Sequence, residues 1–485
     1  MSNPHLIRIP ESSRVFDRRK VLGVLLSFLA MSMMAVSSVN VALPAIESGL
    51  GATGGDLQWV LSGYALVFGI TLVPAGRTGD AVGRGAFFML GVVVFLLASL
   101  ACGLAPTPMV LNIARLLQGV GAGIVNPQIT GMIQQYFTGR SRGTAFGWFG
   151  LVISVSVAIG PVLTGALIAL LGPENGWRAS FLVNMPIGLI GLVLALRWFP
   201  FSQERRLWNS RSAGVPKFDL DPLGSVLLML AVLSLMLPFM VHDRPWILLL
   251  LLVAPVLLFA WVRWERFYRD SGRAPMVDLA LFSFRSFSNQ VRIASVVFLA
   301  QPAVYVLLAL YVQNGLGASA LETALVGLSG AISSAMVSVW AGQQAHTHGR
   351  RLLPAAMLLM LGSALGSVLV VVLVERLGIG FGWLAVPLFF NGIGMGGFVA
   401  ASQTLAMQDV PLEHGGTAGG VKQTAERIGT AIGIAVLTGV FFLAVDRWDW
   451  NRAFEIGFVL VALISLLAFA FAMLDRRQFS ERAPR

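Results

Sequence analysis

The stretch Gly76-Arg77-Thr78-Gly79-Asp80-Ala81-Val82-Gly83-Arg84 joins two apolar runs and is the most informative segment of the sequence. Its glycines permit a tight turn, and an acid in such a turn can cap and neutralise the positive N-terminal end of a nearby helix. The arginines can pair with that acid or reach lipid headgroups. Breaking the cluster would then release two helix bundles from each other. A simpler interpretation is a charged loop that only anchors the chain at a membrane surface.

The same spacing occurs a second time in the chain. Gly342, His346, Gly349 and Arg350 repeat it 266 residues later, with a histidine at the position that corresponds to Asp80. Internal repeats of this kind are typical of transporters built from duplicated halves. The repetition favours a structural role for the motif over a charged loop that only anchors the chain.

The composition is that of an integral membrane protein. Charged residues are 12% of the 485 residues, about half the share of roughly 25% found in soluble domains. Hydrophobic residues make up 56%, so a water-soluble fold would lack polar surface. A membrane helix needs ~20 apolar residues, and the ten-residue alternations of membrane strands are absent. The sequence therefore predicts an all-α membrane protein and excludes a membrane β-barrel.

Apolar runs bounded by charges, proline or glycine predict fourteen membrane-spanning helices. The predicted spans are residues 21–43, 57–76, 86–104, 109–131, 143–171, 179–199, 221–241, 246–262, 287–312, 322–343, 353–374, 382–407, 416–442 and 453–474. Because the second copy of the motif follows the tenth span, the second half begins at the ninth, and the seventh and eighth form an inserted pair.

The basic residues predict the orientation of these spans. If the N-terminus is cytoplasmic, 26 of the 34 Lys and Arg residues lie in cytoplasmic segments, 5 lie in the opposite loops and 3 lie within or near the ends of spans. This distribution obeys the positive-inside rule. It places both termini in the cytoplasm and explains the net charge of +11 without a nucleic acid as a partner.

The predicted domains follow from the spans and the repeat. They are a cytoplasmic tail (1–20), an N-terminal six-helix bundle (21–199), cytoplasmic loops with two inserted helices (200–286), a C-terminal six-helix bundle (287–474) and a cytoplasmic tail (475–485).

The residue inventory excludes several functions. The single cysteine, Cys102, lies in an apolar run, which leaves no internal disulfide or CxxC metal site. None of the three lysines follows a glycine, so the chain has no phosphate-binding P-loop. The five histidines lie in tails or loops and cannot form a metal cluster or a catalytic triad inside the membrane. No metal, cofactor or enzymatic activity is expected.

The stretch 76–84 resembles the signature between the second and third helices of the major facilitator superfamily. Residues 111–123 are similar to the fourth-helix motif of that superfamily, and residues 158–165 resemble the Gly-Pro motif of helix five that marks its antiporters. Residues 177–188, together with 40–44, resemble the fourteen-helix drug:proton antiporter family. The resemblance covers residues 20–475. It implies two six-helix bundles with two inserted helices. It also implies that the two bundles rock about a midplane cavity to alternate access.

The resemblance also assigns roles to individual residues. In the family, the arginine that matches Arg115 lines the central cavity and is linked to proton movement. A charge near the bilayer centre is costly and must find partners, although an arginine snorkelling from a helix end is the alternative. The kink that matches Gly160, Pro161 and Gly165 is thought to shape the cavity and prevent leak. Pro161 removes a backbone hydrogen bond and lets the helix bend or pack closely, and a kink without a transport role remains the other interpretation.

Polar side chains within apolar spans are candidates for the substrate cavity. Those on the helices that line the cavity in the superfamily are Asn40, Arg115, Gln118, Gln301, Tyr305 and Asn391. Interhelical hydrogen bonds are the alternative role for each of them.

The thirteenth span carries the remaining charges inside the membrane. Lys422 and Glu426 are four residues apart and share a helix face, where they can neutralise each other. Against the family's pattern, Glu426 falls on an arginine position and Arg427 on a glutamine. We hypothesise that Glu426, with Arg115 and Lys422, couples proton entry to export. A neutralised pair near the cytoplasmic end of the span is the alternative.

One departure from the family bears on the substrate. The family places an aspartate five residues before Asn40, where this chain has Ala35. A cationic drug would lack its counter-charge, so neutral, anionic or lipid-like molecules become more plausible substrates. The expected function is a proton-driven exporter of hydrophobic or amphipathic small molecules such as drugs or toxic metabolites. The alternatives are an exporter or symporter of a specific lipid-like or anionic metabolite and, remotely, a membrane-embedded enzyme or scaffold.

The expected surroundings follow from this function. The partners are the lipid bilayer, a small-molecule substrate and protons, and the protein is expected to be a monomer. The preference for arginine over lysine indicates a GC-rich bacterial genome, and the expected location is the bacterial cytoplasmic membrane.

Overall fold

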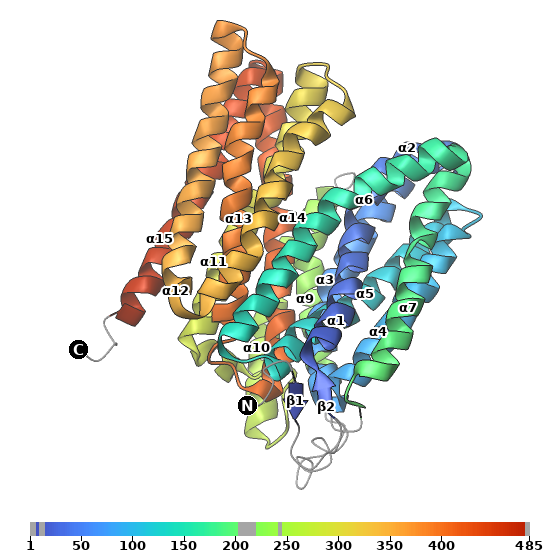
Figure 1. Cartoon of the computed structure of the whole chain (residues 1–485), viewed down its shortest axis with the longest axis vertical. Coiled ribbons are helices and arrows are strands. Elements are labelled where there is room, and N and C mark those ends of the chain that lie inside the picture. The colour runs from blue at the N-terminus through green and yellow to red at the C-terminus, as the bar shows by residue number, and fades with distance from the viewer. Residues whose placement is uncertain (1–5, 9–14, 202–219, 241–244, 481–485) are drawn as a thin grey trace. The chain divides into compact units, whose positions relative to one another are not determined.

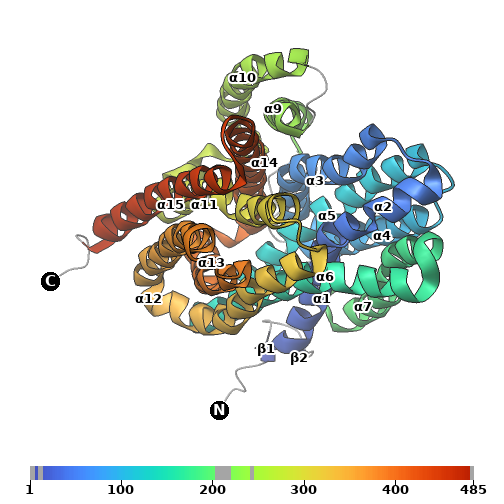
Figure 2. The ribbon, with the colours of Figure 1, turned by 90° about the horizontal axis from the view of Figure 1, so that it is seen from above.

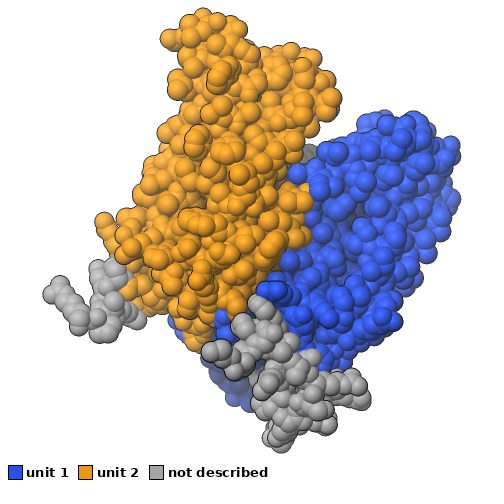
Figure 3. Space-filling model, viewed as in Figure 1, with its two compact units in different colours: residues 1–138, 156–283, 410–424 blue, residues 139–155, 284–409, 425–485 orange. Residues whose placement is uncertain are grey.

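The chain is almost entirely helical and divides into two compact units. The computed structural model describes residues 6–8, 15–201, 220–240 and 245–480 (Figure 1). Unit 1 consists of Met1–Thr138, Ser156–Ser283 and Val410–Thr424, and unit 2 consists of Gly139–Val155, Phe284–Asp409 and Ala425–Arg485 (Figure 3). Two helices therefore belong to both units, because one helix changes unit at Ser156 and another at Ala425.

Unit 1 holds the N-terminal helices and the two helices that the sequence predicts to be an inserted pair. Its elements are β1 (Leu6–Arg8), β2 (Val15–Asp17), α1 (Arg18–Ser37), α2 (Val39–Leu50), α3 (Gly54–Val82), α4 (Arg84–Gly103), α5 (Pro108–Tyr136), the second part of α6 (Gly139–Leu182), α7 (Asn184–Trp198), α9 (Pro222–Met240), the 3-10 helix η1 (Pro245–Leu249), α10 (Leu250–Asp270), and the 3-10 helices η2 (Leu279–Ser283) and η5 (Leu412–His414). Helices α9 and α10, which the sequence predicts to be an inserted pair, pack side by side (Figure 2). The short antiparallel pair of β1 and β2 lies in the predicted N-terminal tail and was not expected from the sequence.

Unit 2 holds the C-terminal helices and the first part of α6. Its other elements are α11 (Arg285–Ala309), the π-helix η3 (Leu310–Gly315), α12 (Ala320–Leu377), the 3-10 helix η4 (Phe381–Leu384), α13 (Ala385–Ala406), most of α14 (Gly415–Arg447) and α15 (Trp450–Ser480).

Local sequence explains where several helices begin. Thr53 and Asp56 form a capping box at the start of α3, and Ser319 and Glu322 form one at the start of α12. In each box the hydroxyl and the carboxylate satisfy backbone N–H groups that the first turn leaves without partners.

The longest helix, α12, folds back on itself. Ser333 Oγ donates to Phe389 O of α13 at 2.7 Å, and a Cβ on Gly394, also of α13, would lie 2.8 Å from Ala356 O. Ser333 and Ala356 are 23 residues apart, about 34 Å along a straight helix. Both nevertheless contact one short stretch of α13, so α12 must turn between them.

The number of membrane crossings follows from helix lengths. Twelve helices of the described residues are long and apolar enough to cross a membrane. Two of these candidates, Gly139–Trp198 and Leu321–Leu377, have 60 and 57 residues, each enough for two crossings of ~20 residues. Gly172 interrupts the first with a non-helical backbone (φ 79°, ψ 165°). The chain is thus an all-α multi-pass membrane protein, and fourteen crossings remain a prediction.

The packing is that of helices in a lipid environment. Large apolar side chains such as Leu170 and Leu252 are 81% and 73% exposed, which suits contact with lipid tails. The interior of unit 1 includes an apolar cluster that contains Leu111, Trp177 and the fully buried Cys102. Unit 2 contains a stack of Phe454 on Phe458, with ring centroids 4.1 Å apart.

The structure has two units where the sequence predicted five parts, and two segments lie in the other half from the one predicted. Residues 139–155 belong to unit 2, and residues 410–424 belong to unit 1. The second segment is important for the candidate site because α3, α4 and α5 hold it, as described next.

Candidate functional site

Residues 76–84, here called the motif loop, form the end of α3 and the start of α4. Gly83 separates the two helices with φ 115°, a conformation that favours glycine. Gly76 lies within α3, where a Cβ would come within 2.4 Å of Gly416 O. One glycine therefore allows the turn, and the other allows the backbone of α3 to contact the start of α14.

Asp80 caps α14. Its carboxylate accepts hydrogen bonds from Gly416 N (3.0 Å), Thr417 N (2.7 Å) and Thr417 Oγ1 (2.8 Å). The side chain is 1% exposed. A negative charge bonded to the N–H groups of a first helical turn also interacts favourably with the helix dipole. The helix that the sequence could only describe as nearby is α14, whose first turn lies 336 residues further along the chain.

Arg84 connects Asp80 to two other segments of unit 1, α5 and η5. Its guanidinium donates to Asp80 Oδ1 (2.7 Å), to Gly131 O and Gln135 Oε1 of α5 (3.0 Å each), and to Leu412 O of η5. Because the pair is buried and hydrogen-bonded, removal of either partner would leave a costly uncompensated charge. Arg77 does not join this network: its Nε is buried and has no hydrogen-bond partner within the described part of the chain.

Further bonds hold the start of α14 against α3 and α5. Gln134 Nε2 donates to Val410 O at 2.8 Å, and Thr424 Oγ1 donates to Gly69 O at 3.2 Å. These residues could not be predicted, because side-chain bonds to backbone carbonyls leave no local pattern in the sequence. We call this set of contacts, together with those of Asp80 and Arg84, the α14 clamp.

Arg115 lies in a second polar cluster, seven residues after the start of α5, and is 1% exposed. It donates to Val60 O (2.9 Å), Ala35 O (3.3 Å) and Gln118 Oε1 (2.6 Å), and its guanidinium lies 4.3 Å from the centroid of the Tyr64 ring. It is therefore a buried arginine and not one that snorkels from a helix end. Among the described residues no carboxylate lies within ion-pair distance of it, so carbonyl dipoles and an aromatic face stabilise its charge.

The other two predicted cavity residues of unit 1 lie in different environments. Gln118 is fully buried beside Arg115 and donates to Ser99 Oγ at 2.7 Å. Asn40 is exposed on α2 and takes no part in these bonds.

The Gly-Pro motif of α6 is a close contact with α1. A Cβ on Gly160 would lie 2.3 Å from Ser37 Oγ, and Gly165 is half-buried near Val41. The non-helical residue inside α6 is Gly172, eleven residues after Pro161. Close packing at Gly160 is therefore seen, and the role of the motif in transport stays a prediction.

In unit 2, three predicted cavity residues lie on α11 and α13. Gln301 and Asn391 are buried, and Tyr305 is 39% exposed. Gln301 Oε1 and Asn391 Nδ2 are buried and have no hydrogen-bond partner among the described residues. Because buried polar atoms are normally paired, these two atoms are available to a water molecule or a substrate.

The charged residues of α14 differ in environment. Lys422 is buried within unit 1, whereas Glu426 and Arg427, which begin the unit 2 part of the helix, are half-buried. The hypothesis that Glu426 carries a proton stays a prediction.

The second copy of the motif, here called the second turn (residues 342–351), lies where α12 folds back. A Cβ on Gly342 would lie 2.3 Å from Gly143 O of α6, so two helix backbones contact each other as they do at Gly76 and Gly416. The counterpart of Arg84 is Arg350, which lies 3.8 Å from Asp475 of α15. The two copies therefore share their glycine contacts but differ in the position of the acid.

Comparisons with known proteins agree with this architecture. The sequence profile of the Major Facilitator Superfamily matches residues 24–434 and 293–485. The chain is 31% identical to the probable actinorhodin transporter of Streptomyces coelicolor, over 88% of this chain and 72% of that protein. It is also 31% identical to the multidrug resistance protein Stp of Mycobacterium tuberculosis, over 87% of this chain and 76% of that protein.

A solved structure supports the fold. The proton:xylose symporter XylE matches with a TM-score of 0.65 at 13% identity, over 93% of this chain and 94% of that chain. With the profile matching nearly the whole sequence, and with relatives that are transporters and not enzymes, the chain belongs to the major facilitator superfamily.

Proposed function

We propose that this protein exports hydrophobic or amphipathic small molecules in exchange for protons, by alternating access. The observation that carries the proposal is the α14 clamp. It consists of hydrogen bonds and one ion pair, which can break and reform, and it holds the first turn of a helix whose remainder belongs to the other unit. Such an arrangement suits a molecule that passes between two discrete states.

The names of two relatives support the proposed direction of transport and the proposed class of substrate. One is named a probable actinorhodin transporter and another a multidrug resistance protein. We extend both properties to this chain as part of the proposal. We likewise propose that the protein lies in a bacterial cytoplasmic membrane as a monomer, with both termini in the cytoplasm.

The buried arginine supports a second candidate, an exporter or symporter of one anionic or lipid-like metabolite. Arg115 has backbone carbonyls as partners, and Ala35 occupies the position where the family has an acid. A buried guanidinium without a carboxylate favours an anionic substrate group over a cationic one.

A single assay distinguishes these candidates. Inside-out vesicles are energised to acidify their lumen, and compounds are added from three classes: a cationic dye, a neutral polycyclic molecule and an amphipathic carboxylate. An antiporter releases luminal protons as each substrate enters. We expect the neutral and acidic compounds to dissipate the gradient and the cationic dye to have little effect. Uptake of a compound without proton release would refute antiport.

Glu426→Gln tests the coupling site. We expect the variant to exchange substrate down a concentration gradient but to lose transport driven by a pH gradient, because a glutamine cannot carry the proton. Glu375→Gln, which neutralises an exposed acid on α12, is the control and should transport normally. Unchanged pH-driven transport in Glu426→Gln would remove this residue from the mechanism.

A further inference from the structure

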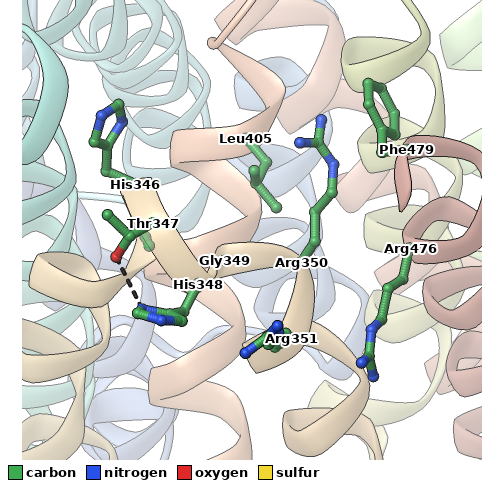
Figure 4. A pocket seen from close by; sticks show the side chains of 10 residues that line it. His346, Thr347, His348, Gly349, Arg350, Arg351, Leu405, Arg476 and Phe479 are labelled. Atoms are coloured by element: carbon green, nitrogen blue, oxygen red, sulfur yellow. Dashed lines mark hydrogen bonds between the residues drawn. The ribbon is translucent and has the colours of Figure 1, made fainter. Parts of the chain in front are cut away.

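Unit 2 contains a pocket of about 270 Å³ between the second turn and the C-terminal end of α15. Figure 4 shows it at close range, with side chains from both elements around it. Its lining residues are Ala345, His346, Thr347, His348, Gly349, Arg350, Arg351, Leu405, Arg476 and Phe479. The volume is at the lower limit of pockets for drug-sized ligands, which enclose ~300–1,000 Å³. A small charged group fits it better than a drug.

The lining is strongly basic. Arg350, Arg351 and Arg476 contribute three guanidinium groups, and the nearest carboxylate, Asp475, is buried and 3.8 Å from Arg350 Nε. Asp475 also accepts a hydrogen bond from Asn289 Nδ2 at 2.7 Å. One acid that is shared in this way cannot neutralise three arginines, so the pocket has a net positive charge.

Arg350 is held in place but is not saturated with hydrogen bonds. Its guanidinium lies 3.5 Å from the centroid of the Phe479 ring, and its buried Nε has no hydrogen-bond partner among the described residues. The other acid with an electrostatic effect on it, Asp409, accepts a hydrogen bond from Ser286 Oγ at 2.6 Å. A guanidinium that is oriented by an aromatic ring and retains a free donor is suited to bind an anion.

The two copies of the motif differ in whether they contain an acid of their own. In the first copy, the motif's own Asp80 neutralises Arg84. In the second copy, His346 occupies the corresponding position and lines the pocket. The second turn has thus kept the arginine and lost the carboxylate.

We propose that this pocket binds a phosphate group, either in the headgroup of an anionic phospholipid or as free inorganic phosphate. Arginine forks match phosphate oxygens in geometry, and basic pockets between membrane helices bind lipid headgroups. This site is separate from the transport of substrate and does not depend on the proposed function. Its occupant takes the place that the Asp80 carboxylate has in unit 1 and joins α12 to α15.

The test uses the full-length protein in nanodiscs of phosphatidylcholine. One arm titrates phosphatidylglycerol into the discs and counts bound lipids by native mass spectrometry. The other arm adds inorganic phosphate and measures binding by calorimetry. The variant is Arg351→Gln with Arg476→Gln, which replaces two exposed side chains. The control, Arg376→Gln with Arg447→Gln, removes two exposed arginines of the same unit that lie outside the pocket.

We expect the control to bind like the unaltered protein and the pocket variant to bind about tenfold more weakly or worse. If only phosphatidylglycerol binds, the ligand is a lipid headgroup. If inorganic phosphate binds as well, or displaces the lipid, the ligand is free phosphate. Chemical labelling of the unaltered protein with phenylglyoxal gives an independent measure, since the ligand should protect Arg351 and Arg476 but not Arg376. Equal affinity in the pocket variant and the control, or the absence of binding in both arms, would overturn the proposal.

Discussion

At the scale of single residues, the α14 clamp depends on the carboxylate of Asp80. It accepts three hydrogen bonds from the first turn of α14 and one from Arg84. A carboxylate is the group that can accept all four, because it has two oxygens and no hydrogen to donate.

Replacing Asp80 with asparagine tests the clamp. The amide NH2 of Asp80→Asn would face other donors, and Arg84 would lose its counter-charge. We expect a loss of stability of about 3 kcal/mol, typical of a broken buried ion pair, and a large loss of transport. Thermal unfolding in detergent and transport in proteoliposomes measure the two effects. Glu413→Gln, which neutralises an exposed acid in η5, should change neither, and normal transport by Asp80→Asn would contradict a role for the clamp.

A substitution at Ala35 tests the basis of substrate charge. Ala35 is 3% exposed, and its carbonyl accepts a hydrogen bond from Arg115. We expect Ala35→Asp to supply the missing acid, to favour cationic dyes and to weaken transport of acidic compounds. The control is Ala35→Asn, because asparagine has nearly the same volume as aspartate but no charge. Efflux of one cationic and one anionic fluorophore is measured for both variants. If the two variants show the same preference between the fluorophores, the charge at position 35 does not select the substrate.

At the scale of elements, the contact between α6 and α12 depends on glycine. A Cβ on Gly342 would overlap the backbone of α6 at Gly143 and Gly147. We expect Gly342→Ala to destabilise the protein by about 1–3 kcal/mol or more, the usual cost of overpacking. Gly362→Ala on the same helix meets nothing within 4 Å, and should stabilise it by about 0.5–1 kcal/mol. Thermal unfolding of the pair measures both, and similar melting temperatures would contradict the contact.

The elements were more predictable than their contacts. Apolar runs between charges predicted the helices, because a membrane span must be long and apolar to exist at all. The turn inside α12 was expected from residues 344–352, which interrupt two apolar runs, and the structure shows the fold-back. The division into units was harder to predict, because residues 139–155 and 410–424 pack according to contacts made far along the chain.

The candidate site was predictable in its residue types and not in its bonds. The spacing of 76–84 indicated a capping acid, but neither Gly416 nor Leu412 could be identified as partners, since backbone N–H and C=O groups are the same at every position. Likewise, Arg115 was expected to need partners in the membrane, yet those partners are mainly carbonyls that any residue could supply.

At the scale of the whole molecule, the prediction of fourteen crossings has a direct test. A protease-cleavable tag inserted after the exposed Glu174 lies just past the break at Gly172, and one after the exposed Thr347 lies in the second turn. If both long helices cross twice, we expect cleavage at the first tag in intact cells and at the second in inside-out vesicles only. Tags at both termini should behave like the second. Cleavage of the Thr347 tag from outside would contradict the predicted topology.

The fully buried Cys102 also has a practical consequence for following the motions of this molecule. Thiol reagents react with accessible thiolates, so the only native sulfhydryl of the chain is shielded from them. Thiol-reactive probes should therefore leave the native cysteine unlabelled. Two cysteines placed at exposed positions, one in each unit, could carry a pair of spin labels or fluorophores without removal of any native residue. Changes in the distance between those labels as substrate or pH is varied would record the working cycle of the transporter itself.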